Sequence, residues 1–185
     1  MVTIGMLWLP ILVATVLVFV ASNLAWMVLP HHKSDTRRLP DEPGTLDALA
    51  RQELRPGVYR FPWSGSMAEM KDPAFLEKLK GPVGLLTVRP SGAFSMGAAM
   101  GAWIAYVVVI GVFVAYVTSR TLAADAPHLQ VFRVAGTVAI LAYAGAHVPD
   151  GIWWGKPWRN VLMEVLDGVA YGLLTAGAFA ALWPR

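Results

Sequence analysis

Long apolar runs alternate with polar stretches along this chain. A helix needs about 20 mainly apolar residues to cross the roughly 30 Å hydrocarbon core of a bilayer. Four runs meet that requirement: Thr3–Leu29, Met96–Thr118, Val131–Val148 and Val161–Trp183. The first two contain no ionisable side chain, whereas the last two contain several. Because ionisable groups inside a membrane normally face protein or water, we expect the last two helices to pack in a bundle.

The first run could be read as a cleavable signal peptide. Such peptides have a basic start and an apolar core of about 7–15 residues. This run is about twice as long, and no Lys or Arg precedes His31. We therefore interpret it as a retained membrane helix.

The polar stretch between the first two runs has its own pattern of elements. Thr45 is placed to cap a helix over Leu46–Glu53, and an extended segment, Val58–Phe61, follows. Asp72-Pro73 then starts a second helix over Ala74–Lys80, before an extended Val83–Val88. The two strands are predicted to pair with each other or with a partner protein.

These patterns predict an all-α membrane protein with four transmembrane helices and a small helix/strand cytoplasmic insertion between helices 1 and 2. The expected parts are helix 1 (1–29), a cytoplasmic arm or small α+β cap (30–95), helix 2 (96–118), an outer loop (119–130), helix 3 (131–148), a Trp-rich cytoplasmic loop (149–160), and helix 4 with the C-terminus (161–185).

Composition supports the membrane interpretation. Of the 185 residues, 56% are hydrophobic and 15% are charged, against about 25% charged in soluble domains. The chain has no Cys, which excludes disulfides and Cys-based metal sites. A formal charge of +3 is too small to indicate nucleic-acid binding.

The basic residues predict an orientation. Of the 15 Lys and Arg residues, all except Arg120, Arg133 and Arg185 lie within 30–95 and 149–160. The positive-inside rule then places those two segments in the cytoplasm and both termini outside. We expect a multi-pass protein of the bacterial inner membrane.

His147, Glu164 and Asp167 form a candidate buried polar cluster. Antiparallel packing of the third and fourth helices would bring the three side chains to one depth, with Asp167 deepest and His147 as its partner. A structural role is favoured, because carboxylates suit a helix start and Lys156 or Arg159 could neutralise them. A contact with a partner protein and a proton relay or cation site are the alternatives.

His31-His32, followed by Asp35, invites a metal hypothesis. Adjacent His side chains diverge on a helix, and no third ligand follows at a recognisable spacing. We predict a polar interfacial exit from the first helix and no metal site.

An aromatic stripe on the second helix could hold a pigment or quinone, but such stripes more often pack against a neighbouring helix. Its members are Trp103, Tyr106, Phe113 and Tyr116. Packing is the preferred interpretation, and no cofactor is predicted.

Two further groups of residues are expected to act at the membrane. Trp153, Trp154 and Trp158, with Lys156 and Arg159, are typical of an interfacial anchor. Small residues recur at a spacing of four, which favours close helix packing against this chain or a partner. They are Gly97, Gly101, Gly168 and Gly172.

Segments of the chain resemble small bacterial inner-membrane proteins that have no assigned chemistry. The resemblance rests on Val28–Asp35, Leu39–Glu42, Met70–Pro73 and Gly81–Gly84. It implies a membrane location but transfers no activity and no site.

No phosphate-binding loop, zinc-protease motif or nucleophile elbow is present, so no enzyme is predicted. We expect a non-catalytic accessory or structural subunit of a larger bacterial membrane complex, such as a respiratory or photosynthetic one. Its partners would be the lipid bilayer and other membrane subunits, contacted through helix packing and the cytoplasmic arm. The alternative is a small proton- or ion-coupled transport protein that uses His147, Glu164 and Asp167.

Overall fold

The structure, a computed structural model, describes residues 2–92 and 94–184. The chain is mostly helical and contains one small two-stranded sheet among the described residues. It divides into two compact units. A helical unit comprises Met1–Asp35 and Ser95–Arg185, and a second unit comprises Thr36–Phe94.

The helical unit contains the four long apolar segments. A short 3-10 turn (Ile4–Leu7), helix α1 (Trp8–Asn23) and a π turn, η2 (Leu24–Val28), form the first, and α4 (Met96–Thr121) forms the second. The third is α5 (His128–Ala144) followed by α6 (His147–Trp153), and the fourth is α7 (Trp158–Ala181). All four are long and apolar enough to cross a membrane, as the sequence predicts.

Several bounds differ from the expected ones by a few residues, and two of the differences have a clear local feature. The fourth helix begins at Trp158 rather than Val161, because Pro157 stands directly before its first turn. The third run is not one helix: α5 ends at Ala144, and His147 begins the separate α6.

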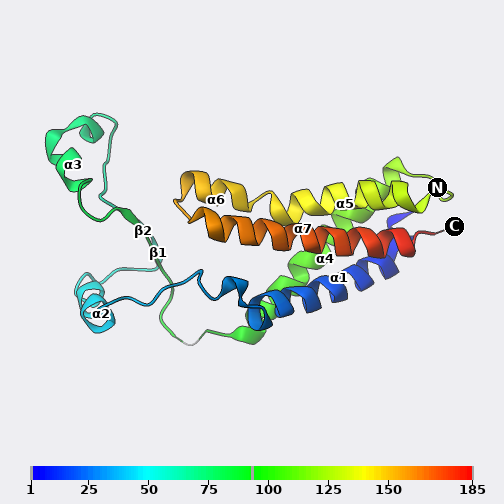
Figure 1. Cartoon of the computed structure of the whole chain (residues 1–185), viewed down its shortest axis with the longest axis horizontal. Helices are drawn as coiled ribbons and strands as arrows, with labels where there is room; N and C mark the ends of the chain where they lie inside the picture. The colour runs from blue at the N-terminus through cyan, green and yellow to red at the C-terminus, as the bar shows by residue number, and fades with distance from the viewer. Residues whose placement is uncertain (1, 93, 185) are drawn as a thin grey trace. The chain divides into compact units, whose positions relative to one another are not determined.

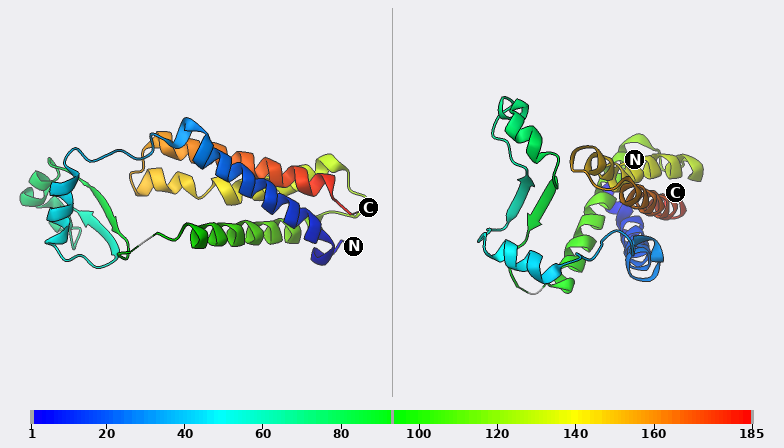
Figure 2. Two further views of the ribbon diagram at one scale, coloured as in Figure 1. Left: turned by 90° about the horizontal axis from the view of Figure 1, so that it is seen from below. Right: turned by 60° about the vertical axis from the view of Figure 1, so that its left-hand side comes forward.

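The four segments pack unequally. Helices α5 and α7 lie side by side, while α1 packs on α7 and α4 (Figures 1 and 2). Two glycines of α7 make the α5 contact close. A Cβ on Gly168 would lie 2.8 Å from backbone atoms of Ala144, and one on Gly172 would lie 2.8 Å from the backbone nitrogen of Ile140. Small residues thus bring the two backbones together.

Helix α4 is buried along only part of its length. Its buried residues run from Val107 to Ser119, and none lies in the first three turns, Met96–Tyr106. The second half of α4 therefore belongs to the core, whereas the first half borders the space described below.

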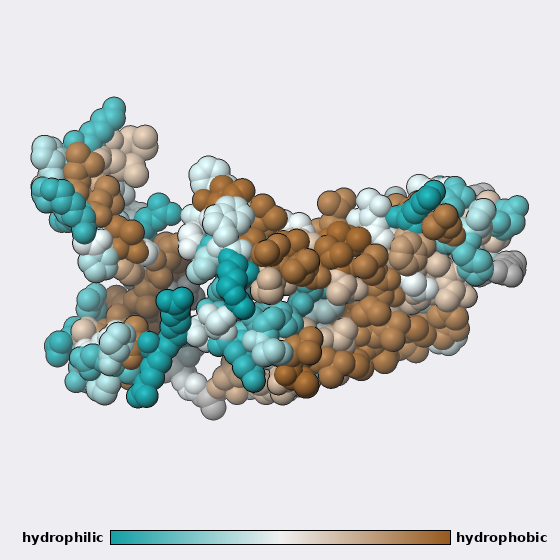
Figure 3. Space-filling view, in the orientation of Figure 1, coloured by the Kyte–Doolittle hydropathy of each residue, from teal (hydrophilic) through white to brown (hydrophobic). Residues whose placement is uncertain are grey.

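The outer surface of the helical unit is apolar. Side chains such as Leu12, Val109 and Phe113 are at least half exposed. Figure 3 shows apolar residues covering the visible face of the helices, with hydrophilic residues gathered at the two ends. Such a surface suits lipid or partner helices better than water.

The second unit contains α2 (Glu42–Ala50), β1 (Gly57–Phe61), the turn Glu69–Lys71, α3 (Pro73–Lys78) and β2 (Gly84–Val88). The strands pair with each other in antiparallel register, Tyr59 opposite Leu86. They lie between the two helices (Figures 1 and 2).

The caps of these helices differ from the predicted ones at one position. Asp72 caps α3 by accepting the Ala74 N–H, as Asp72-Pro73 predicts. Helix α2 is capped by Asp41, which accepts the Gly44 N–H, and not by Thr45. Thr45 lies inside the helix, and its hydroxyl donates to the Asp41 carbonyl. The Asp-Glu-Pro start was the stronger signal, because Pro suits the first turn of a helix.

Candidate functional site

Two His–carboxylate clusters and a pocket lie together in the helical unit. The first cluster joins Asp167 of α7 to the turn that follows η2. The second joins Glu164, one turn earlier on α7, to α6 and the loop after it. All parts belong to Met1–Asp35 and Ser95–Arg185, so they share one compact unit.

Both oxygens of Asp167 face histidines. The Nε2 atom of His31 lies 3.1 Å from Oδ1, and the Nε2 atom of His32 lies 2.9 Å from Oδ2. Leu29 is extended, and Pro30 then starts a 3-10 turn, Pro30–His32, that carries both rings. This arrangement corrects one expectation: the partners of Asp167 are His31 and His32, not His147.

Several contacts hold the His32 ring. Its Nδ1 lies 2.5 Å from an oxygen of Asp35, and the Trp26 ring stacks on it with centroids 3.9 Å apart. Arg159 donates to the other Asp35 oxygen at 3.1 Å and to the His31 carbonyl at 2.9 Å. The His32 side chain is only 4% exposed. The histidine turn is therefore fixed to the start of α7.

The charge environment of His32 favours its protonated form. Burial alone would lower its pKa, but the hydrogen bonds to Asp167 and Asp35 and the two negative charges outweigh that effect. The net result is a pKa above the ordinary value of 6.5.

Glu164 is the centre of the second cluster. The Lys156 ammonium donates to its two oxygens at 2.6 and 2.5 Å, and His147 Nδ1 lies 3.2 Å from the carboxylate. Gly155, with φ +69°, makes the left-handed turn that precedes Lys156. Glu164 is only 8% exposed.

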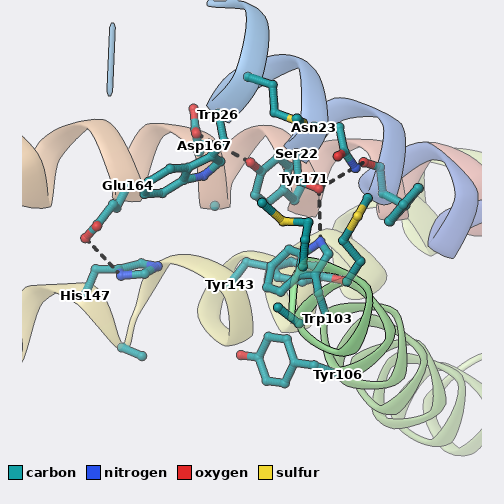
Figure 4. A pocket seen from close by; sticks show the side chains of 17 residues that line it. Ser22, Asn23, Trp26, Trp103, Tyr106, Tyr143, His147, Glu164, Asp167 and Tyr171 are labelled. Carbon is teal, nitrogen blue, oxygen red and sulfur yellow. Dashed lines mark hydrogen bonds and ion pairs between the residues drawn. The ribbon is translucent and has the colours of Figure 1, made fainter. Parts of the chain in front are cut away.

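A pocket of about 590 Å³ separates the two clusters from the first half of α4. All four apolar segments contribute to its wall (Figure 4). Its lining is mainly aromatic and Met side chains, including Trp26, Trp103, Tyr106, Tyr143, Tyr171, Met27, Met96 and Met100. His147, Glu164 and Asp167 line the pocket as well. The three residues predicted to form one cluster thus line one cavity. Glu164 and His147 contact each other there, whereas Asp167 contacts His31 and His32.

Hydrogen bonds and ring contacts order the pocket wall. Trp103 donates its indole N–H to Ser22 at 2.9 Å, and Tyr171 donates to Asp167 at 3.4 Å (Figure 4). The Tyr143 and Tyr171 rings meet edge to face, with centroids 5.9 Å apart. Aromatic pairs of this geometry add to the energy of burial.

The predicted aromatic stripe of α4 divides into two parts. Trp103 and Tyr106 line the pocket, whereas Phe113 and Tyr116 are 61% and 50% exposed on the outer surface. Tyr116 packs against the guanidinium of Arg120, 5.9 Å from its ring centre.

The predicted anchor residues have mixed environments. Trp153, Trp154 and Trp158 are all more than half exposed. Lys156 and Arg159 are instead engaged by carboxylates of the chain, Glu164 and Asp35. Among the small residues, Gly168 and Gly172 pack on α5, while a Cβ on Gly97 or Gly101 would meet nothing within 4 Å.

The Asp167 cluster is the feature that sequence reasoning missed. Its third member lies 135 residues from His32, so no local motif could reveal it. A signal was nevertheless present. In a four-helix antiparallel arrangement the end of the first helix and the start of the fourth lie on the same side, which brings the His pair to the depth of Asp167.

No family model, no curated protein and no solved structure matches this chain. The geometry of the site is therefore the basis for the proposals that follow.

Proposed function

We propose that this protein is a four-span membrane protein that holds a small lipid-soluble molecule in the pocket beside α4. The observation that carries the proposal is the pocket itself, about 590 Å³ and bordered by all four apolar segments. Sites for small molecules have volumes of about 300–1,000 Å³, mostly apolar walls and a few convergent polar groups. This pocket has each of these properties.

The chemistry of the wall indicates the class of molecule. Trp103, Tyr106 and Tyr171 offer flat aromatic surfaces, and the flexible side chains of Met96 and Met100 adapt to different shapes. The histidine and carboxylate groups of the wall lie on the α6–α7 side, and Ser22 and Asn23 add polar groups from α1. We therefore propose an amphiphile with a flat ring and a hydrogen-bonding head group, a class that includes quinones.

The test is a titration of the detergent-purified protein with decylubiquinone, followed by tryptophan fluorescence. Trp26 and Trp103 line the pocket, so we expect saturable quenching. Ala99 also lines it, and Ala99→Phe should fill the cavity and weaken binding at least tenfold. The matched control is Ala98→Phe, because Ala98 is exposed on the same helix and is not part of the wall.

Quenching that rises linearly without saturating, and equally in the native chain and Ala99→Phe, would show only partition into the detergent. That result would overturn the proposal. Saturable binding that Ala99→Phe abolishes and Ala98→Phe keeps would support it.

A separate observation supports a role as an accessory subunit. Gly97 and Gly101 form a small-residue face on the part of α4 that this chain leaves unburied. Such faces allow a second helix to approach closely. We propose that this face receives a transmembrane helix of a larger assembly, in agreement with the non-catalytic role that the sequence predicts.

Affinity purification in mild detergent tests this second role. A stoichiometric membrane partner should copurify with the native chain and with Ala102→Leu, which alters an exposed neighbouring position. Gly101→Leu should lose the partner while its melting temperature stays unchanged. A native chain that purifies alone and monodisperse would contradict the role.

The ion-coupled alternative stays a prediction. Its three residues are divided between the Lys156–Glu164–His147 cluster and the Asp167–His31–His32 cluster. No transport step is proposed from them.

A further inference from the structure

His31, His32 and Asp167 bring three metal-ligating side chains to one point. Their ligand atoms, two imidazole nitrogens and a carboxylate oxygen, all lie within 4.8 Å of one another. We propose that these residues bind a divalent transition-metal ion of the zinc type. The inference does not depend on the proposed lipid-soluble ligand.

The spacing of the ligand atoms fits an ion. Bonds from zinc to nitrogen or oxygen measure about 2.0–2.2 Å, so neighbouring ligand atoms lie roughly 2.9–3.5 Å apart. The two Nε2 atoms lie 3.1 and 2.9 Å from the oxygens of Asp167. An ion between them would need only a small adjustment of the side chains.

The hydrogen bonding of His32 determines which ring nitrogen would face an ion. Its Nδ1 lies against the Asp35 carboxylate, which only accepts hydrogen bonds, so Nδ1 carries a proton. Nε2 is left to face Asp167, 2.9 Å from Oδ2. A metal ion at this point would take the place of the proton between Nε2 and Asp167, because a metal-binding imidazole nitrogen must be unprotonated.

The Asp35–His32 pair also has the form of the outer shell of a metal site. A metal-binding histidine commonly donates its other N–H to a carboxylate, which fixes its tautomer and orientation. Here Asp35 is itself held by Arg159 at 3.1 Å, and Trp26 stacks on the imidazole. The ring is thus oriented before any ion arrives.

The second cluster is less suited to an ion. His147, Asp150 and Glu164 also bring ligand atoms within 4.8 Å of one another. Lys156 already places an ammonium against both oxygens of Glu164, at 2.6 and 2.5 Å. A divalent ion there would have to displace a charged partner or lie beside it. The structure therefore favours the Asp167 cluster, and His147 becomes the natural control.

The nature of the ligands defines the metal class. Imidazole and carboxylate suit zinc, iron, cobalt and manganese, and no thiolate is available because the chain has no Cys. Three protein ligands leave at least one coordination position open. Asp167 also lines the pocket, so the proposed ion site and the cavity share this side chain.

The experiment uses the full chain in mild detergent, purified through a tag that contains no histidine. Zn²⁺ binding is measured by competition with a chromophoric chelator, and Co²⁺ binding by visible absorption. We expect about one ion per chain. His31→Gln and Asp167→Asn should each weaken Zn²⁺ binding at least tenfold, whereas His147→Gln should bind as the native chain does.

Asp35→Asn tests the outer shell separately. Loss of such a carboxylate commonly weakens metal binding about 10–100-fold while the ligands remain. His31→Gln is the least disruptive ligand variant, because its ring is 24% exposed and the Arg159 contact uses its backbone carbonyl. An unchanged elution profile will show that this variant is folded.

Three results would overturn the proposal: no stoichiometric Zn²⁺ or Co²⁺ binding by the native chain, native affinity in both His31→Gln and Asp167→Asn, or an equal loss in His147→Gln. The first would show that protons alone join His32 to Asp167. Ala99→Phe should still bind the ion, so failure of the lipid-soluble ligand and failure of the metal site are distinguishable.

Discussion

Two carboxylates in the first turns of α7, Glu164 and Asp167, form shielded polar contacts in the helical unit. They lie one turn apart, and each contacts basic side chains from a different part of the chain. Glu164 has Lys156 and His147, while Asp167 has the His31-His32 turn. A buried carboxylate without such partners would cost several kcal/mol.

We predict that Lys156→Met destabilises the protein. The change leaves the Glu164 carboxylate, 8% exposed, with only the 3.2 Å contact to His147. Loss of one partner of a shielded ion pair should lower the free energy of unfolding by about 2 kcal/mol, less than for a fully buried pair because Lys156 is partly exposed. Thermal or denaturant unfolding in detergent measures the change.

Two variants control this experiment. Lys33→Met removes an exposed ammonium from the same unit and should be neutral. Adding Glu164→Gln to Lys156→Met removes the unmatched charge and should recover much of the lost stability. If Lys156→Met melts as the native chain does, the ammonium contributes no net stability to Glu164.

The contact between α5 and α7 is the most extensive contact between two helices of this unit. It depends on backbone approach at Gly168 and Gly172, where any side chain would collide with α5. Helices in lipid gain little from burying apolar surface, so such packing contributes much of their association.

We predict that Gly168→Ala and Gly172→Ala each lower stability by about 1–3 kcal/mol, the usual cost of overpacking. At Gly168 the new Cβ would lie 2.8 Å from the nitrogen and Cα of Ala144, which are rigid helix backbone. Gly97→Ala and Gly101→Ala are matched controls, because nothing lies within 4 Å of a Cβ there. Unfolding in detergent should rank the two pairs accordingly. Equal effects in both pairs would contradict close packing of α5 on α7.

The elements were largely predictable because their signals are local. Apolar length alone defines the four spans, and Asp72-Pro73 marks the start of α3. The break after Ala144 was not predicted, because the run to Val148 stays apolar across it. Thr45 and Asp41 can both accept a backbone N–H at a helix start. The structure shows that Asp41 is the cap.

The site was predictable only in part, because its contacts are not local. Glu164 and His147 lie on neighbouring segments, which made them candidates for one cluster, and their side chains lie 3.2 Å apart. The partners of Asp167 come from the far end of the chain, and the preference for His147 followed from considering only the adjacent helix. The pocket depends on the unburied first half of α4, a property of packing that no sequence pattern expresses.

For the whole molecule, basic residues are the main predictor of orientation. Lys and Arg concentrate in 30–95 and 149–160, and the spans are even in number. In the helical unit, α1 begins and α7 ends at the same end, opposite α6 (Figure 1). The positive-inside rule then predicts that the α6 end, with the histidine turn and the pocket's polar groups, faces the cytoplasm.

Single-cysteine labelling tests this orientation cleanly, because the native chain has no Cys. Met67, 74% exposed in the second unit, and Ala123, exposed between α4 and α5, are suitable sites. In bacterial cells with a permeabilised outer membrane, an impermeant maleimide should label Ala123→Cys at once and Met67→Cys only after lysis. The reverse order would invert the orientation and place the histidine turn outside. Immediate labelling of both would contradict the four-span arrangement, since an odd number of crossings must separate the two positions if α4 spans the membrane.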